Sequence, residues 1–189
     1  MVGFNIPELC DVFGIERQSV KRAMTPERMT EMYHLVFEGL KRAVRQLSLE
    51  HLDWVAPERP RSMRQLLWHS FERPKLSIEA WESGHFTEEM VRRYEELANN
   101  YRTQEDICRY ADQIEAELTE FLRRGDRLRK EVETYMGPLT VHELIELALG
   151  HAVQHLRHAY HYFPKLGIVP DQPLEPKDYA DVAIPKDLF

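Results

Sequence analysis

Residues 140–163 read TVHELIELALGHAVQHLRHAYHYF, and this stretch decides the fold. Thr140 and Glu143 have the spacing of a capping box, in which two side chains satisfy backbone N–H groups at the start of a helix. Beyond them, apolar residues recur every three or four positions, which is typical of a helix with one buried face. Pro164 follows directly and cannot continue a helix. The sequence therefore predicts a helix from Thr140 to about Phe163.

Three more long helices are predicted upstream, each from a start signal followed by apolar residues at helical spacing. The first begins at Thr25, which can cap a helix, and Pro26 suits the first helical position. The second begins at Ser62 and the third at Thr103. Four long helices in one chain of 189 residues predict an all-α four-helix bundle.

Two parts of this helical pattern are interrupted. Pro74 is predicted to kink or stop the second helix, with a shorter segment continuing to Gly84. Residues 85–101 are ambiguous, and we interpret them as a peripheral helix. Strand-like alternation of apolar and polar residues is hard to find anywhere in the chain.

The chain divides into three segments by composition. Residues 25–163 form the predicted bundle, and residues 1–24 form an N-terminal extension. Residues 164–189 hold five of the 11 prolines. We therefore expect an irregular, extended, Pro-rich C-terminal tail that either wraps the domain or crosses to a partner.

The composition argues against several classes of protein. Lys and Arg total 25 against 32 Asp and Glu, and this net charge of -7 argues against direct nucleic-acid binding. Cys10 and Cys108 form no CxxC pair, which fits a reducing compartment. We expect no membrane span and no signal peptide, because no apolar run approaches ~20 residues and the N-terminus carries Glu8 and Asp11. The expected location is cytoplasmic. Glycine motifs for nucleotides and the GxSxG elbow are also missing.

Histidine is the residue type that points to chemistry. Of nine histidines, four lie between His151 and His161. His151 and His155 are one helical turn apart, so both rings lie on one face and can bind one metal ion. His69, flanked by apolar residues of the second helix, is the best third ligand, since bundle cores build metal sites from facing helices. His158 could replace His151 or support a ligand from behind. The alternative interpretation is that these histidines have only a structural role.

Charged residues near this candidate site allow both a functional and a structural interpretation. Glu72, about one turn after His69, could act as a general base or orient the His69 ring, although we expect an exposed helix carboxylate there. Arg64 and Arg157 are candidate cations for a pocket beside the metal, or simply solvated side chains.

Two segments resemble motifs of the DinB/YfiT-like family. Residues 62–69, SMRQLLWH, resemble its second-helix motif. Residues 137–144, GPLTVHEL, running into HAVQHLRH at 151–158, resemble its last-helix motif. The resemblance implies an up-down-down-up four-helix bundle, often a homodimer, with a three-His site for a divalent metal, commonly nickel or zinc. Related members use low-molecular-weight thiols in transferase or isomerase chemistry.

The last helix departs from the family pattern at one point. Many relatives carry a pair of adjacent histidines followed by Arg-Gly-Gln, whereas His158 is followed here by Ala159. A ligand pair shifted by one turn would end on Ala159, which cannot bind a metal. We therefore keep His151 and His155 as the ligands of this helix.

Two classes of function remain at this point. The first is a divalent-metal-dependent enzyme that acts on a small molecule by hydrolysis or thiol-dependent transfer. The second is a non-catalytic, stress-associated helical dimer with a structural or vestigial metal site. The residues that would do catalysis, beyond the metal ligands, are not identified by the sequence.

Overall fold

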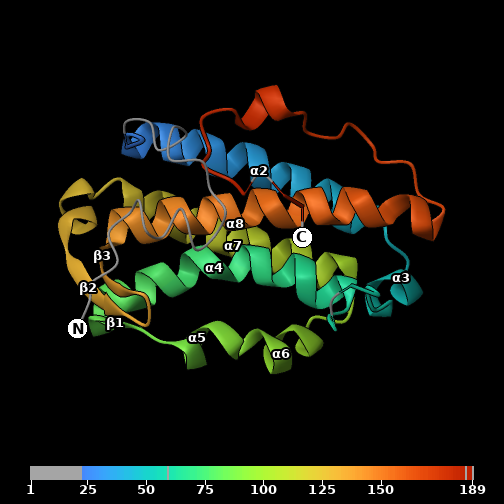
Figure 1. The fold of residues 1–189 in the computed structure, drawn as a ribbon, viewed down its shortest axis with the longest axis horizontal. Helices are drawn as coiled ribbons and strands as arrows, with labels where there is room; N and C mark the ends of the chain where they lie inside the picture. Colours follow the sequence, from blue (N-terminus) through green and yellow to red (C-terminus); the bar gives the residue numbers. More distant parts are fainter. Residues whose placement is uncertain (1–22, 59, 186, 189) are drawn as a thin grey trace.

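The computed structural model describes residues 23–58, 60–185 and 187–188. Most of them are helical, as predicted, and four long helices dominate (Figure 1). The long helices are α2 (Pro26–Gln46), α4 (Met63–Ser83), α7 (Gln104–Leu122) and α8 (Val141–Tyr162). The predicted N-terminal extension, residues 1–24, lies almost entirely outside the described residues.

The four predicted helix starts are confirmed by their caps. In α2 the Thr25 side chain accepts a hydrogen bond from the backbone N–H of Arg28. Capping boxes open the other three helices, so local sequence alone sets where each one begins. Their paired residues are Ser62 with Gln65, Thr103 with Asp106, and Thr140 with Glu143.

Pro74 does not end α4, which continues to Ser83 before Gly84 closes it in a left-handed conformation (φ 82°). A proline inside a helix costs about 3 kcal/mol. Here the turn beyond Pro74 is buried, with Leu76 fully inaccessible and Ile78 nearly so. Burial of this turn offsets the lost hydrogen bond and keeps α4 in one piece.

The long helices surround one apolar core. Helix α4 packs against α8 and α7, and α2 packs against α7 and α8. Figure 1 shows α4 running beside α8, the arrangement that places the candidate site. The largest fully buried side chains are Trp68, Tyr33, Tyr162, Phe37, Phe71 and Phe163.

A small three-stranded sheet, which the sequence pattern did not predict, closes one end of the helices. Its order is β1 (His85–Phe86), β2 (Glu131–Thr134) and β3 (Gly137–Thr140). β1 pairs parallel to β2, and β2 pairs antiparallel to β3. Strands of two to four residues are too short to show a period of two, which explains the omission.

The single peripheral helix expected over residues 85–101 is wrong. After β1, the chain forms α5 (Glu88–Arg92), α6 (Tyr94–Leu97) and the 3-10 turn η2 (Ala98–Asn100). Tyr94 and Ala98 anchor this segment in the core. The other short helical elements are α3 (Leu49–Asp53), η3 (Gly125–Arg129), η4 (Phe163–Leu166) and η5 (Pro176–Tyr179).

The described part of the Pro-rich tail wraps its own domain. The Gln46 side chain of α2 donates a hydrogen bond to the Val169 carbonyl at 2.8 Å. Tyr179 and Val182 are buried. The tail then crosses α8 so closely that a Cβ at Gly150 would lie 2.3 Å from the Ala183 carbonyl oxygen.

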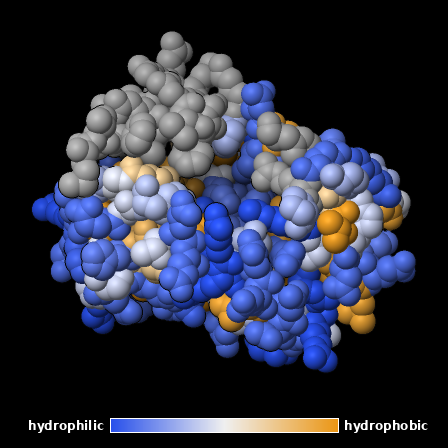
Figure 2. Space-filling model, turned by 60° about the horizontal axis from the view of Figure 1, so that its bottom comes forward, coloured by the Kyte–Doolittle hydropathy of each residue, from blue (hydrophilic) through white to orange (hydrophobic). Residues whose placement is uncertain are grey.

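The exposed surface is mostly hydrophilic on the face that Figure 2 presents, with hydrophobic residues scattered among charged ones. No described helix is both long and apolar enough to cross a membrane.

Candidate metal centre

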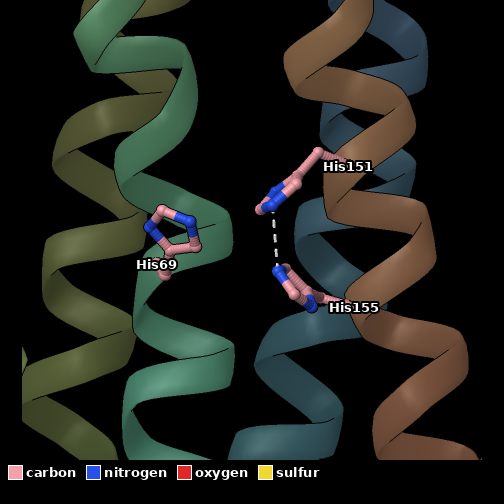
Figure 3. A group of neighbouring side chains, drawn as sticks. All are labelled: His69, His151 and His155. Carbon is pink, nitrogen blue, oxygen red and sulfur yellow. Dashed lines mark hydrogen bonds between the residues drawn. The ribbon is translucent and has the colours of Figure 1, made fainter. Parts of the chain in front are cut away.

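The three predicted ligands, His69, His151 and His155, lie together between α4 and α8. One ring nitrogen from each lies within 4.8 Å of the others. Figure 3 shows His69 projecting from α4 toward the two rings on α8, which lie one turn apart with their planes at 88° to each other. His69 and His155 are each only 2% exposed. The sequence therefore identified a real side-chain cluster that could hold a metal ion.

The spacing of the two α8 rings suits a shared cation. Nε2 of His151 lies 3.0 Å from Nε2 of His155. Two nitrogens bound to one tetrahedral zinc ion are about 3.3 Å apart, given zinc–nitrogen distances of about 2.0–2.1 Å. The His69 ring centre lies 4.9 Å from that of His151 and 5.8 Å from that of His155. Small side-chain rotations would bring all three rings onto one ion.

The hydrogen bonding and charge of the candidate histidines also suit a metal ion. Nδ1 of His69 and Nδ1 of His151 are buried and make no hydrogen bond. Burial holds the pKa of both imidazoles well below the usual value, and neighbouring Arg73 and, for His151, His155 lower it further. The two rings are therefore neutral at pH 7 and keep a lone pair for a cation.

Glu72 is not the exposed helix carboxylate that we expected. Its side chain is buried, and burial raises its pKa. Oε1 accepts a hydrogen bond from Nε of Arg93 at 2.8 Å. Oε2 has no hydrogen bond and lies 3.9 Å from Nδ1 of His69. Arg93 belongs to the segment after β1, so this hydrogen bond joins two residues that are far apart in the sequence. Glu72 thus faces the His69 ring from behind.

His158 lies behind His155 and outside the cluster of three. Its Nδ1 is 3.3 Å from Nδ1 of His155, and its Nε2 bonds the Leu188 carbonyl of the tail. A carbonyl only accepts, so Nε2 of His158 carries a proton; when the His158 ring is neutral, its Nδ1 is left to accept a hydrogen bond from Nδ1 of His155. His155 then keeps its Nε2 lone pair directed toward His151. The tail thereby fixes the tautomer of a candidate ligand.

Ala159, the second position of the shifted register, is buried in the apolar core. The pair of His151 and His155 is the one that converges with His69.

A second group of potential metal ligands is a weaker candidate for a metal site. It consists of His34, Glu38 and Glu115. The ammonium of Lys41 lies 2.5 Å from Glu38 and 3.4 Å from Glu115. A cation therefore already neutralises these carboxylates. His34 itself is exposed and pairs with Glu115 at 2.6 Å.

The two arginines proposed for the pocket do not lie beside the histidines. Arg64 is buried, bonding Asp53 and the Tyr101 and Arg102 carbonyls. Arg157 bonds the Pro185 carbonyl of the tail at 3.0 Å.

The cation that does border the site is Arg73, which sequence reasoning missed. It lines a cavity together with His151. The sequence spacing could have identified Arg73, because it follows His69 by four positions and therefore lies on the same face of α4.

Comparisons of the chain with protein-family models, with curated proteins and with solved structures found no match.

Proposed function

We propose that this chain is a divalent-metal-dependent enzyme of the DinB/YfiT type, acting on a small molecule by hydrolysis or thiol-dependent transfer. The observation that carries the proposal is the convergence of three imidazoles from α4 and α8, two of them buried, with one ring nitrogen of each within 4.8 Å of the others. The resemblance of residues 62–69 and 137–144 to the family motifs adds to it. With that family come the up-down-down-up bundle, a homodimer and a cytoplasmic location, which are parts of the same proposal.

Nickel or zinc is the metal that we propose, because imidazole nitrogen suits both ions. Three neutral ligands leave the ion its full charge, so when bound it can acidify a water or thiol and polarise a substrate. The chain's own residues hold the ligands in place: Glu72 lies behind His69, and His158 with the Leu188 carbonyl lies behind His155. Such support fixes ring orientation.

The first experiment is elemental analysis of untagged protein after exposure to nickel or zinc. We expect about one ion per chain in the wild type and almost none in His69→Ala or His155→Ala. His161→Ala, which changes an exposed histidine of α8, is the matched control and should keep the ion. Absence of metal from the wild type, or full metal in His69→Ala, would overturn the proposal.

One observation favours the non-catalytic alternative. The tail reaches the site, since Ala183 and Pro185 border the cavity beside His151 and Leu188 bonds His158. A structural site has all its coordination positions filled by protein, whereas a catalytic one keeps a position open. Addition of a small thiol to nickel-loaded protein distinguishes the two. We expect a new sulfur-to-nickel absorption band; an unchanged spectrum would favour the non-catalytic dimer.

A further inference from the structure

A cavity of about 130 Å³ adjoins the histidine cluster on the side of His151. Its walls come from α4, α8, the sheet and the tail, so the whole fold contributes to it. The lining is mainly apolar and includes Phe86, Leu144, Ala148 and Pro185. An apolar cavity of ~150 Å³ can bind benzene. The space therefore suits an apolar group of about that size.

Arg73 is the charged group in this apolar wall. Its Nη1 is buried and makes no hydrogen bond, and its Cζ lies 5.8 Å from the centre of the Phe86 ring. Within the described residues, no carboxylate forms an ion pair with it. The adjacent Glu72 is instead bonded to Arg93.

An arginine in this position lacks the anion that would balance it. Burial lowers the pKa of Arg73, although the Tyr135 hydroxyl and the Glu72 carboxylate raise it. Arg73 has a hydrogen bond with the Tyr135 hydroxyl, but burying a guanidinium without an anion to balance its charge is unfavourable. The planar fork of the group matches a carboxylate in two parallel hydrogen bonds. A ligand with a carboxylate head and a compact apolar body would satisfy both the cation and the cavity.

We propose that this cavity binds a small monocarboxylate with a benzene-sized apolar body, its head group on Arg73 and facing His151. The acid would be the substrate class of the metal site, and that assignment alone rests on the proposed function. Binding of the acid needs only Arg73 and the cavity, so it can be measured without metal.

The test is calorimetric titration of the full-length chain with benzoate and with benzamide, which has the same shape and no charge. We expect benzoate to bind the wild type roughly tenfold or more tightly than benzamide, because hydrogen bonds to charged groups contribute about 1.5–3 kcal/mol. Arg73→Gln should lose this preference. Arg123→Gln, which changes an exposed arginine beyond α7, is the matched control and should bind like the wild type.

Ala148→Leu provides a second variant in case Arg73→Gln fails to fold. It fills the cavity but keeps Arg73, and it should abolish benzoate binding. Equal affinities for benzoate and benzamide, or wild-type benzoate binding by either Arg73→Gln or Ala148→Leu, would overturn the inference.

Metal content measured on the same samples separates this inference from the proposed function. Wild type that takes up no nickel or zinc but still binds benzoate would refute the metal enzyme and leave the carboxylate site intact. Metal-loaded wild type that ignores benzoate would refute the carboxylate site alone.

Discussion

Helices α2 and α7 bury a mostly apolar surface, whereas α4 and α8 bury histidine, glutamate and serine. On the α2–α7 side, the buried charged residue is Lys41, which reaches carboxylates at the surface. On the α4–α8 side, His69, Glu72, His155 and His158 are all at most 2% exposed. Helices α2 and α7 therefore contribute an ordinary apolar core. Helices α4 and α8 bury polar groups in place of some apolar side chains.

The difference indicates that the two pairs have different tasks. Apolar burial stabilises a fold, while buried polar groups add little stability unless they are fully hydrogen-bonded. On the α4–α8 side, Nδ1 of His69, Nδ1 of His151 and Oε2 of Glu72 are buried and make no hydrogen bond. Departures of this kind from good packing are expected where a protein binds or catalyses. Each variant predicted below changes a residue either of the α2–α7 pair or of the α4–α8 pair.

The largest expected effect is on stability. Ile114→Ala in α7 removes a nearly inaccessible core side chain and should lower the free energy of unfolding by about 2–5 kcal/mol, with metal binding retained. His69→Leu should leave the free energy of unfolding of metal-free protein unchanged or raise it, because a partnerless polar group is replaced by an apolar one. Urea unfolding measures both. Equal losses in the two variants would make His69 a structural residue of the core.

A smaller effect is expected on metal affinity. His158→Ala removes the group that contacts Nδ1 of His155, so metal affinity should fall about 10–100-fold while the helical domain stays folded. Competition with a chelator of known affinity measures the change. His161→Ala on the same helix serves as the reference. Unchanged affinity in His158→Ala would show that the contact with the tail does not support the site.

The smallest effect concerns a half-buried histidine of α8. Nε2 of His142 lies 3.6 Å from Glu146, and this carboxylate raises the pKa of His142 above its usual value. Glu143 and the backbone of Met24 also favour the charged ring. A raised pKa stabilises the fold below the unfolded-state pKa of about 6.5 and loses that contribution as pH rises through the folded-state value.

His142→Gln tests this sign. Because the pair is partly exposed, the loss should be about 0.2–1 kcal/mol at about pH 5.5 and close to nothing at about pH 8.5. Urea unfolding of variant and wild type at both pH values gives the difference. A larger loss at the higher pH would contradict the assignment.

Features that depend on neighbours in sequence could be predicted. Among the features that depend on distant contacts, the meeting of His69 with the two α8 histidines was predicted, and most others were not. Capping boxes lie within four residues, so Ser62 and Thr140 were enough to place their helices. The ligand pair on α8 is likewise a matter of helical spacing. The burial of Glu72 depends on Arg93, 21 residues away and in a segment with no clear pattern.

The role of Arg73 illustrates the same limit. Its position on the His69 face of α4 follows from spacing. Its lack of a carboxylate partner and the apolar cavity in front of it depend on how β1, α8 and the tail come together. No local pattern encodes that arrangement.

Gly150 gives a simple way to judge relatives of this chain. Any side chain at that position would collide with the tail backbone at Ala183, which packs against α8 without room for one more carbon atom. A relative that keeps the three histidines but not this glycine must route its tail elsewhere. It would then lack the cavity wall that Ala183 and Pro185 supply. A single alignment column would thus separate chains that share the three histidines from chains that also share the cavity beside them.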